Sequence, residues 1–279
     1  MEEKKKNLRF KKLKYKMILY FMLAGLLPLT VINLQWGIMA KKELVDKAFI
    51  SLQSIQSIKC GQVRDYFNSG LNDLEYLSKK ASVLDFYKIA KERYLDKLPP
   101  YNSDFKEYNS FVENEAGSLS ADIGEFLSAN DYNNFYLIDF ETSYVLFTQY
   151  YSRALGTNLA DGRFNRSLLA DCWEEARSKK DSFFMDFDSF ALDKGSYFGF
   201  IGAPIYDEDG ALAAIAVLQL SPDFITKIMS SKLGVGETGE WYLVNWDAAD
   251  KAFSYRSKLP SRGFQLGYQP KGSKPKYWK

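Results

Sequence analysis

The sequence contains no histidine, and this absence excludes several kinds of chemistry. Histidine is the usual general base near neutral pH, a common zinc ligand and the partner of Ser or Cys nucleophiles. The sequence also contains no phosphate-binding loop motif. The densest acid clusters are Glu174-Glu175, on the polar side of an expected helix, and Asp207-Glu208-Asp209, in an expected hairpin turn, where solvated carboxylates are ordinary. We therefore predict no catalytic residue, no metal site and no cofactor, and expect that the protein is not an enzyme.

Cysteine is also scarce. The two cysteines, Cys60 and Cys172, are far apart in the sequence and show no metal-binding or redox spacing. We expect them to be unpaired packing residues, and a disulfide between them outside the cytoplasm is the alternative.

Residues 17–40 lack any charged side chain. A helix of this length reaches roughly 36 Å, enough to cross a hydrocarbon core of about 30 Å. Eight Lys and Arg precede it against two Glu, and such a cationic flank stays on the cytoplasmic side. We predict a single-pass protein of the bacterial cytoplasmic membrane, in contact with membrane lipid, with a cytoplasmic N-terminus and its bulk periplasmic or extracellular. A cleaved secretory signal and a buried core helix are the alternatives.

The formal net charge of +2 hides an uneven distribution. The first 16 residues and residues 251–279 are basic, and the latter contain no acid, so the residues between them are acidic. An acidic body lacks the electrostatic footprint of a nucleic-acid-binding protein, and we predict no nucleic-acid partner.

From Lys41 to about Lys91 apolar residues recur at intervals of three and four without proline, which indicates a long amphipathic helix, with a break expected near Gly61 or Gly70. Its apolar stripe can pack against the chain's own domain, against a second copy, or against each in turn along its length. We predict a homodimer through this helix.

After Pro99-Pro100 a helical segment is expected over residues 105–127 and another over 165–179. Aromatic and β-branched runs predict five mostly antiparallel strands. Their expected ranges are 133–140, 144–151, 182–187, 196–206 and 211–220. The fold class is therefore α+β: a transmembrane helix, a long extracytoplasmic helix and a five-stranded sheet with flanking helices.

Three stretches occur in an order that resembles a known family: LIDFETSYVLFTQYY with GTNL, then FIGAPIYDEDGALAAIAVLQL, then GVGETGEWYLVN. Together they are similar to the extracytoplasmic Cache sensor region, a PAS-like fold, of bacterial chemotaxis receptors and sensor kinases. The resemblance covers residues 17 to about 247 and fits the double-Cache type. It implies a small ligand held between the sheet and the loops and helices above it.

The sequence also departs from that family, because no second spanning helix, linker or output domain follows the Gly-Glu-Thr-Gly strand. Residues 251–279 lack helix or strand periodicity and resemble unfolded or out-of-frame sequence, so we expect a receptor whose reading frame was lost shortly after Asn245. The predicted segments are a basic tail (1–16), a transmembrane helix (17–40), a long amphipathic helix (41–98), a membrane-distal PAS-like module (99–230), the start of a truncated membrane-proximal module (231–250) and a disordered basic tail (251–279).

We predict the ligand site from polar and aromatic residues on or beside the strands. The candidates are Tyr136, Tyr151, Arg153, Asp186, Tyr197 and Asp207. Asp186 interrupts an apolar run and needs a cationic ligand, an Arg or water to offset the cost of burial. Arg153 is suited to a carboxylate ligand, whereas Asp207 also suits a simple turn residue and the tyrosines also suit core packing. The amine-binding Trp, Tyr and Arg pattern of some family members is not recognisable.

These features predict a membrane-anchored sensor of a small-molecule ligand for chemotaxis or signal transduction, lacking its output domain. The sensor half of a histidine kinase or of a cyclic-dinucleotide enzyme is one alternative. A non-signalling membrane scaffold that binds another protein is the other, with the exposed aromatic residues as its interface.

Overall fold

The computed structural model describes residues 2–95, 106–150, 153–207, 209–247, 252–259, 263 and 266–269. The chain divides into two compact units, Met1–Ser57 and Ile58–Lys279. The first unit lies within helix α1 (Glu2–Ser78), and its apolar side chains from Met17 to Met39 are exposed. Among the described residues, this helix contains the one stretch that is long and apolar enough to cross a membrane, with a mean hydropathy of 2.0. The helix predicted over residues 17–40 is thus present.

The second unit is built on an antiparallel five-stranded sheet. Its strands are β1 (Tyr132–Asp139), β2 (Val145–Thr148), β3 (Phe183–Phe190), β4 (Ser196–Tyr206) and β5 (Leu212–Leu220). Their order across the sheet is β2-β1-β5-β4-β3, and every neighbouring pair is antiparallel. The predicted α+β class and its five strands are confirmed.

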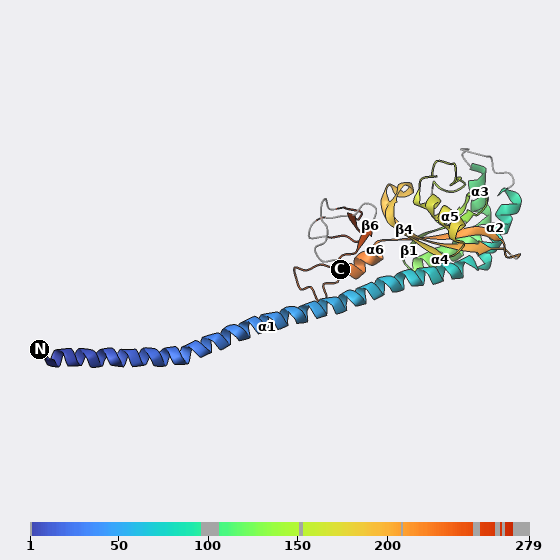
Figure 1. Cartoon of the computed structure of the whole chain (residues 1–279). Helices are drawn as coiled ribbons and strands as arrows, with labels where there is room; N and C mark the ends of the chain where they lie inside the picture. The colour runs from blue at the N-terminus through green and yellow to red at the C-terminus, as the bar shows by residue number, and fades with distance from the viewer. Residues whose placement is uncertain are drawn as a thin grey trace. The chain divides into compact units, whose positions relative to one another are not determined.

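Each face of this sheet carries its own hydrophobic core, because successive side chains of a strand point to opposite faces. The first core lies beneath α1, α2 (Ala81–Arg93), α3 (Lys106–Glu115), α4 (Gly117–Ala129) and α6 (Asp223–Ser230). The second core lies beneath α5 (Leu168–Lys179) and the loop that precedes it. In Figure 1 the sheet is seen between α5 on one side and the end of α1 with α4 on the other.

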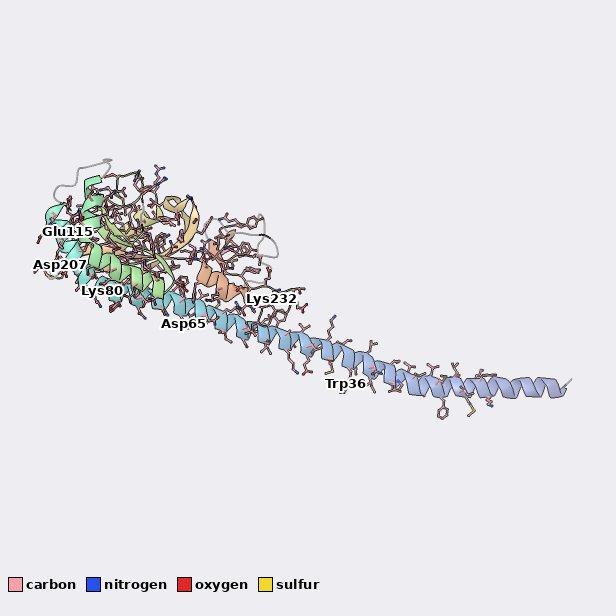
Figure 2. The ribbon with its side chains drawn as sticks, turned by 180° about the vertical axis from the view of Figure 1, so that it is seen from behind. Trp36, Asp65, Lys80, Glu115, Asp207 and Lys232 are labelled. Carbon is pink, nitrogen blue, oxygen red and sulfur yellow. The ribbon has the colours of Figure 1, made fainter. Side chains whose placement is uncertain are left out.

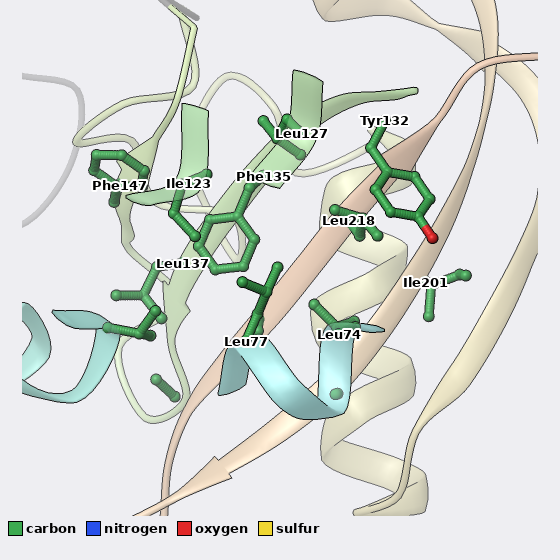
Figure 3. Packing of buried hydrophobic residues seen from close by; sticks show 14 of the residues in the cluster. Leu74, Leu77, Ile123, Leu127, Tyr132, Phe135, Leu137, Phe147, Ile201 and Leu218 are labelled. Atoms are coloured by element: carbon green, nitrogen blue, oxygen red, sulfur yellow. The ribbon is translucent and has the colours of Figure 1, made fainter. Parts of the chain in front are cut away.

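The last turns of α1 belong to the first core. Leu74 and Leu77 are completely buried, and Figure 3 shows them against Phe135, Leu137 and Leu218 of the sheet. Burying one leucine side chain stabilises the fold by about 1.5–3 kcal/mol, so this end of the helix is firmly attached to the sheet. The part of the apolar stripe from Val63 to Leu77 therefore packs against the chain's own domain.

The long helix ends earlier than predicted. It stops at Ser78, an extended Lys80 follows, and α2 begins at Ala81, whereas the sequence predicted a break near Gly61 or Gly70. Gly70 has a different purpose: a Cβ there would lie 2.5 Å from the Ile201 side chain, so glycine permits close packing of helix on sheet.

The prediction that residues 251–279 are disordered is wrong for residues 252–259. Strand β7 (Ala252–Tyr255) pairs with β6 (Val244–Asp247) in a second, two-stranded sheet. The Phe253 ring packs edge-on to Trp246 at 4.9 Å, so aromatic cross-strand contacts hold this pair despite the high positive charge of the region. Residues 270–279 lie outside the described part, and the division into two sensor modules remains a prediction.

Helix α2 is attached to the sheet by a buried polar contact. The Tyr87 hydroxyl donates to the Ala213 carbonyl oxygen at 3.0 Å and lies 3.2 Å from Asp139 Oδ1. Asp139 also accepts the Thr142 backbone N–H at 2.7 Å, which shapes the turn after β1. Burial raises the pKa of Tyr87 well above its ordinary value, and the nearby Asp139 carboxylate raises this pKa further.

We expect the substitution Tyr87→Phe to lower the free energy of unfolding by about 1–2 kcal/mol near neutral pH, because Asp139 and the Ala213 carbonyl lose a buried donor. A raised pKa stabilises the fold fully below the ordinary tyrosine pKa of about 10, and this contribution is lost as the pH rises through the raised value. The difference between wild type and variant should therefore shrink above about pH 10. Urea unfolding across this pH range measures it, with the exposed Tyr76→Phe as control, and a constant difference would contradict the assignment.

Candidate functional site

A row of buried polar side chains interrupts the second face of the sheet. Asn134 of β1 lies directly opposite Gln219 of β5, and both side chains are buried. Gln219 is in turn opposite Phe200 of β4, so it occupies the middle of the sheet. A polar group placed this deep must be hydrogen bonded, since an unpaired one costs about 1–3 kcal/mol.

Two further residues complete this polar row, which consists of Asn134, Tyr136, Thr148 and Gln219. The Tyr136 hydroxyl donates to Gln219 Oε1 at 2.9 Å, and Asn134 Nδ2 donates to Thr148 Oγ1 at 2.9 Å. Antiparallel pairing brings them together, because Tyr136 is opposite Thr148 across β1 and β2. The row therefore presents amide and hydroxyl groups on an otherwise apolar face.

The chain that leaves β2 starts at this row. Asn134 Oδ1 accepts the Tyr150 backbone N–H at 3.2 Å, and the Thr148 hydroxyl donates to the Tyr150 carbonyl oxygen at 3.1 Å. Further along, Arg163 donates to the Arg153 carbonyl oxygen at 2.7 Å. The loop from β2 to α5 thus joins the polar row to two exposed guanidinium groups.

Helix α5 covers the second core and begins with an ordinary cap, in which Ser167 Oγ accepts the Ala170 N–H. The Trp173 indole N–H donates to the Phe140 carbonyl oxygen at 3.1 Å, which fixes the helix on the sheet. Cys172 is buried on the same side, and burial raises the pKa of its thiol. Cys172 and Cys60 are both free, as expected, but only Cys172 is a packing residue, because Cys60 is exposed on α1.

The structure does not bring the predicted site residues together. Tyr136 lies in the polar row, Tyr151 lies outside the described residues, and Arg153 is exposed in the loop after β2. Tyr197 is near the start of β4 and Asp207 follows its end, which separates the two by about 33 Å along the strand.

Asp207 is the cap of a hairpin turn. Its Oδ1 accepts the backbone N–H groups of Asp209 at 3.1 Å and Ala211 at 2.8 Å, and Figure 2 places it at one end of the domain. These bonds match the turn-residue alternative.

Asp186 has an arginine partner. Its Oδ2 accepts hydrogen bonds from Arg256 Nε at 2.9 Å and from Asn245 Nδ2 at 2.8 Å. Arg256 Nη2 lies 2.8 Å from the same oxygen. Of the three partners named for this acid, the arginine is present, and it comes from the region that was expected to be disordered. Asp186 therefore ties β3 to the β6–β7 sheet.

Sequence reasoning missed Asn134, Thr148 and Gln219. A signal for one of them is present in the sequence, because Gln219 stands alone as an amide within the run ALAAIAVLQL, whereas Asn134 is adjacent to Asn133 at the start of its run. The partnership of Asn134 and Gln219 depends on the β1–β5 register, which brings together residues far apart in the sequence.

Comparison with models of known protein families found no match, and comparison with curated proteins found none either. Among solved structures, the chain is similar to the sensor domain of the V. cholerae histidine kinase DctB, at 10% identity and a TM-score of 0.48, over 76% of this chain and 65% of that one. It is similar to an extracellular ligand binding receptor from Desulfohalobium retbaense at 13% identity and a TM-score of 0.44, over 77% and 32% of the two chains.

A third similar structure is the ligand-binding domain of the Campylobacter jejuni chemoreceptor Tlp3 in complex with L-valine, at 16% identity and a TM-score of 0.30, over 61% of this chain and 65% of that one. The chain spans less than two thirds of the length of each of these structures. All three are described as sensor or receptor proteins or domains.

We expect Asp186→Ala to lower the free energy of unfolding by about 1 kcal/mol, because it leaves the largely buried Arg256 guanidinium without its anion. In a double-mutant cycle with Arg256→Ala, the combined loss should be smaller than the sum of the two single losses. Chemical unfolding measures the cycle. Asp188→Ala, an exposed acid on the same strand, is the control, and strict additivity would show that the two side chains do not interact.

Proposed function

We propose that the protein is a membrane-anchored sensor that binds a small carboxylate-bearing molecule over the polar row. The observation that carries the proposal is the buried Tyr136–Gln219 hydrogen bond in the middle of an apolar sheet face. A purely structural core would be served by apolar residues at both positions, since a buried polar pair contributes little net stability. Ligand sites typically combine an apolar lining with a few precisely placed polar groups.

The chemistry of the row suits an anionic group. The Gln219 amide carries two N–H donors in addition to the oxygen that Tyr136 occupies, and the Asn134 amide has the same composition. Arg153 and Arg163 in the following loop add positive charge, which attracts carboxylates from solution and pairs with them in two-point hydrogen bonds. Amino acids and small organic acids fit this description.

The proposed topology is a cytoplasmic N-terminus, one spanning helix over residues 17–40 and a domain outside the cytoplasm. The eight Lys and Arg before the apolar stretch support this orientation. Ligand binding would favour one of two packings of the sheet on α1, provided that the ligand has a different affinity for each packing. The attachment of Leu74 and Leu77 to the sheet offers a direct route from the domain to that helix. Dimerisation through α1 belongs to the same proposal.

The test is a thermal-shift screen of the full chain in lipid nanodiscs against single amino acids, dicarboxylic acids and amines. A ligand that binds the folded state raises its unfolding temperature, by an amount that grows with the ratio of ligand concentration to Kd. We expect a shift with at least one carboxylate-bearing compound. Capture of a protein partner without a shift from any compound would favour the scaffold alternative instead.

We expect Tyr136→Phe and Gln219→Met to weaken binding of the identified compound by about tenfold each. The double variant should lose less free energy of unfolding than the two single variants lose together, because both members of the buried pair are then apolar. Isothermal calorimetry measures affinity, and Tyr76→Phe, which removes the same hydroxyl from an exposed position on α1, is the matched control. Unchanged affinity in both single variants would remove the polar row from the site.

A further inference from the structure

A groove lies on the opposite side of the sheet from the polar row, between α1, the α4–β1 turn and α6. Its volume is about 470 Å³, and it adjoins a smaller hollow of about 370 Å³ that shares Asp131, Tyr132 and Phe224 with it. Three carboxylates line it, from Asp65, Asp73 and Asp131, and its lining contains no lysine or arginine. We call it the acidic groove.

Helical geometry arranges two of these acids. Asp65, Ser69 and Asp73 are spaced four residues apart, so they form one line along the surface of α1. Asp65 and Asp73 are separated by about 12 Å along the helix axis. Asp131 enters from the turn before β1, where its backbone adopts a left-handed conformation with φ of 57°. The acids thus approach the groove from two separate parts of the fold.

These carboxylates are not neutralised within the described part of the chain. None of the three forms an ion pair there, although Asp73 accepts a hydrogen bond of 2.6 Å from the Tyr132 hydroxyl. Lys227 lines only the adjoining hollow, and the Lys59 ammonium is bound to the Ile228 carbonyl oxygen. Negative charge collected in this way favours a positively charged occupant.

A second observation comes from Tyr66, which lines the groove and is 8% exposed. Its ring stacks on Phe224 of α6 at 4.1 Å, and its buried hydroxyl has no hydrogen-bond partner among the described residues. Burial and the charge of Asp131 raise the pKa of Tyr66 to about 12. An unpaired buried hydroxyl costs stability, so its presence beside the acids points to a partner that is bound from outside the chain.

We propose that the acidic groove binds an organic ammonium compound, with Asp65, Asp73 and Asp131 as its anions and the Tyr66 hydroxyl as a hydrogen-bond partner. A metal ion suits the groove less well, because no group of three or more metal-ligating side chains is present among the described residues. The Phe224 and Tyr66 rings supply an apolar wall for the carbon chain of such a compound. The separation of Asp65 and Asp73 favours a diamine over a monoamine.

This site is independent of the polar row, which lies on the other face of the sheet, so either proposal can fail without the other. The groove also lies where α1 and α6 meet. An ammonium compound held by Asp65 of α1 and Asp131 of the α4–β1 turn, against Phe224 of α6, would stabilise the packing of α6 on α1.

The probe is 1,8-diaminooctane, titrated into the full chain in nanodiscs of neutral lipid, with 1,8-octanediol as its uncharged counterpart. We expect calorimetry to show that the diamine binds and the diol does not, and that the diamine binds more weakly at high salt. The double variant Asp65→Asn, Asp131→Asn should bind about tenfold or more weakly. The matched control is Asp46→Asn, Asp85→Asn, which removes the same charge from exposed positions outside the groove and should bind as the wild type does.

The variant Tyr66→Phe separates binding from folding. It removes an unpaired buried hydroxyl, so the unfolding temperature should stay the same or rise while the diamine affinity falls. Loss of affinity with intact folding supports the proposal. The proposal is overturned if the diamine does not bind the folded wild-type protein, if the diol binds equally well, or if the Asp65 and Asp131 double variant retains wild-type affinity.

Discussion

The burial of the sheet on both faces is the constraint on which the rest of the structure depends. A strand in such a sheet must carry apolar side chains in both directions, as in β5, where nearly every residue is buried. Two separate layers of helix are then required to exclude water. The chain supplies one layer with α5 and the other with the end of α1 and the short helices α2, α3, α4 and α6. The long helix is therefore part of the domain's core.

Much of this arrangement could be predicted from local patterns. The β strands carry aromatic and β-branched runs, and the α5 face with Leu169, Cys172 and Trp173 has clear helical spacing. These signals depend on residues close together in the sequence. The end of α1 gave no such signal, because Gly70 has the appearance of a helix break and its value comes from Ile201, a residue 131 positions away.

The candidate sites were harder to predict for the same reason. A single Gln in an apolar strand has no defined meaning until the register places Asn134 beside it and Tyr136 within hydrogen-bonding reach. The charge of residues 252–259 misled the prediction in the opposite direction. High positive charge favours disorder, yet Asp186 neutralises Arg256 and aromatic rings stabilise the strand pair. Contacts between residues far apart in the sequence therefore determine both the polar row and the structure of residues 252–259.

Two contacts connect the domain to α6 and to the segment that follows it. Asp186 of β3 forms an ion pair with Arg256 of the following segment. The buried Lys59 of α1 donates to the Ile228 carbonyl oxygen at 2.5 Å, in the last turn of α6 where a cation is favoured. Its ammonium also lies 5.8 Å from the ring of Trp241, which belongs to the following segment. Burial lowers the pKa of Lys59, because desolvation disfavours its charged form.

These contacts depend on different elements of the domain, because Asp186 belongs to the sheet and Lys59 to α1. A displacement of β3 would act on the segment through Asp186, and a displacement of α1 would act on it through the Lys59–Trp241 contact. The end of α1 packs on the sheet that contains β3, and a closely packed core transmits strain from one element to the next. A change in how α1 packs on the sheet would therefore reach the residues after α6 through Arg256 and Trp241, without any contact between a ligand and that segment.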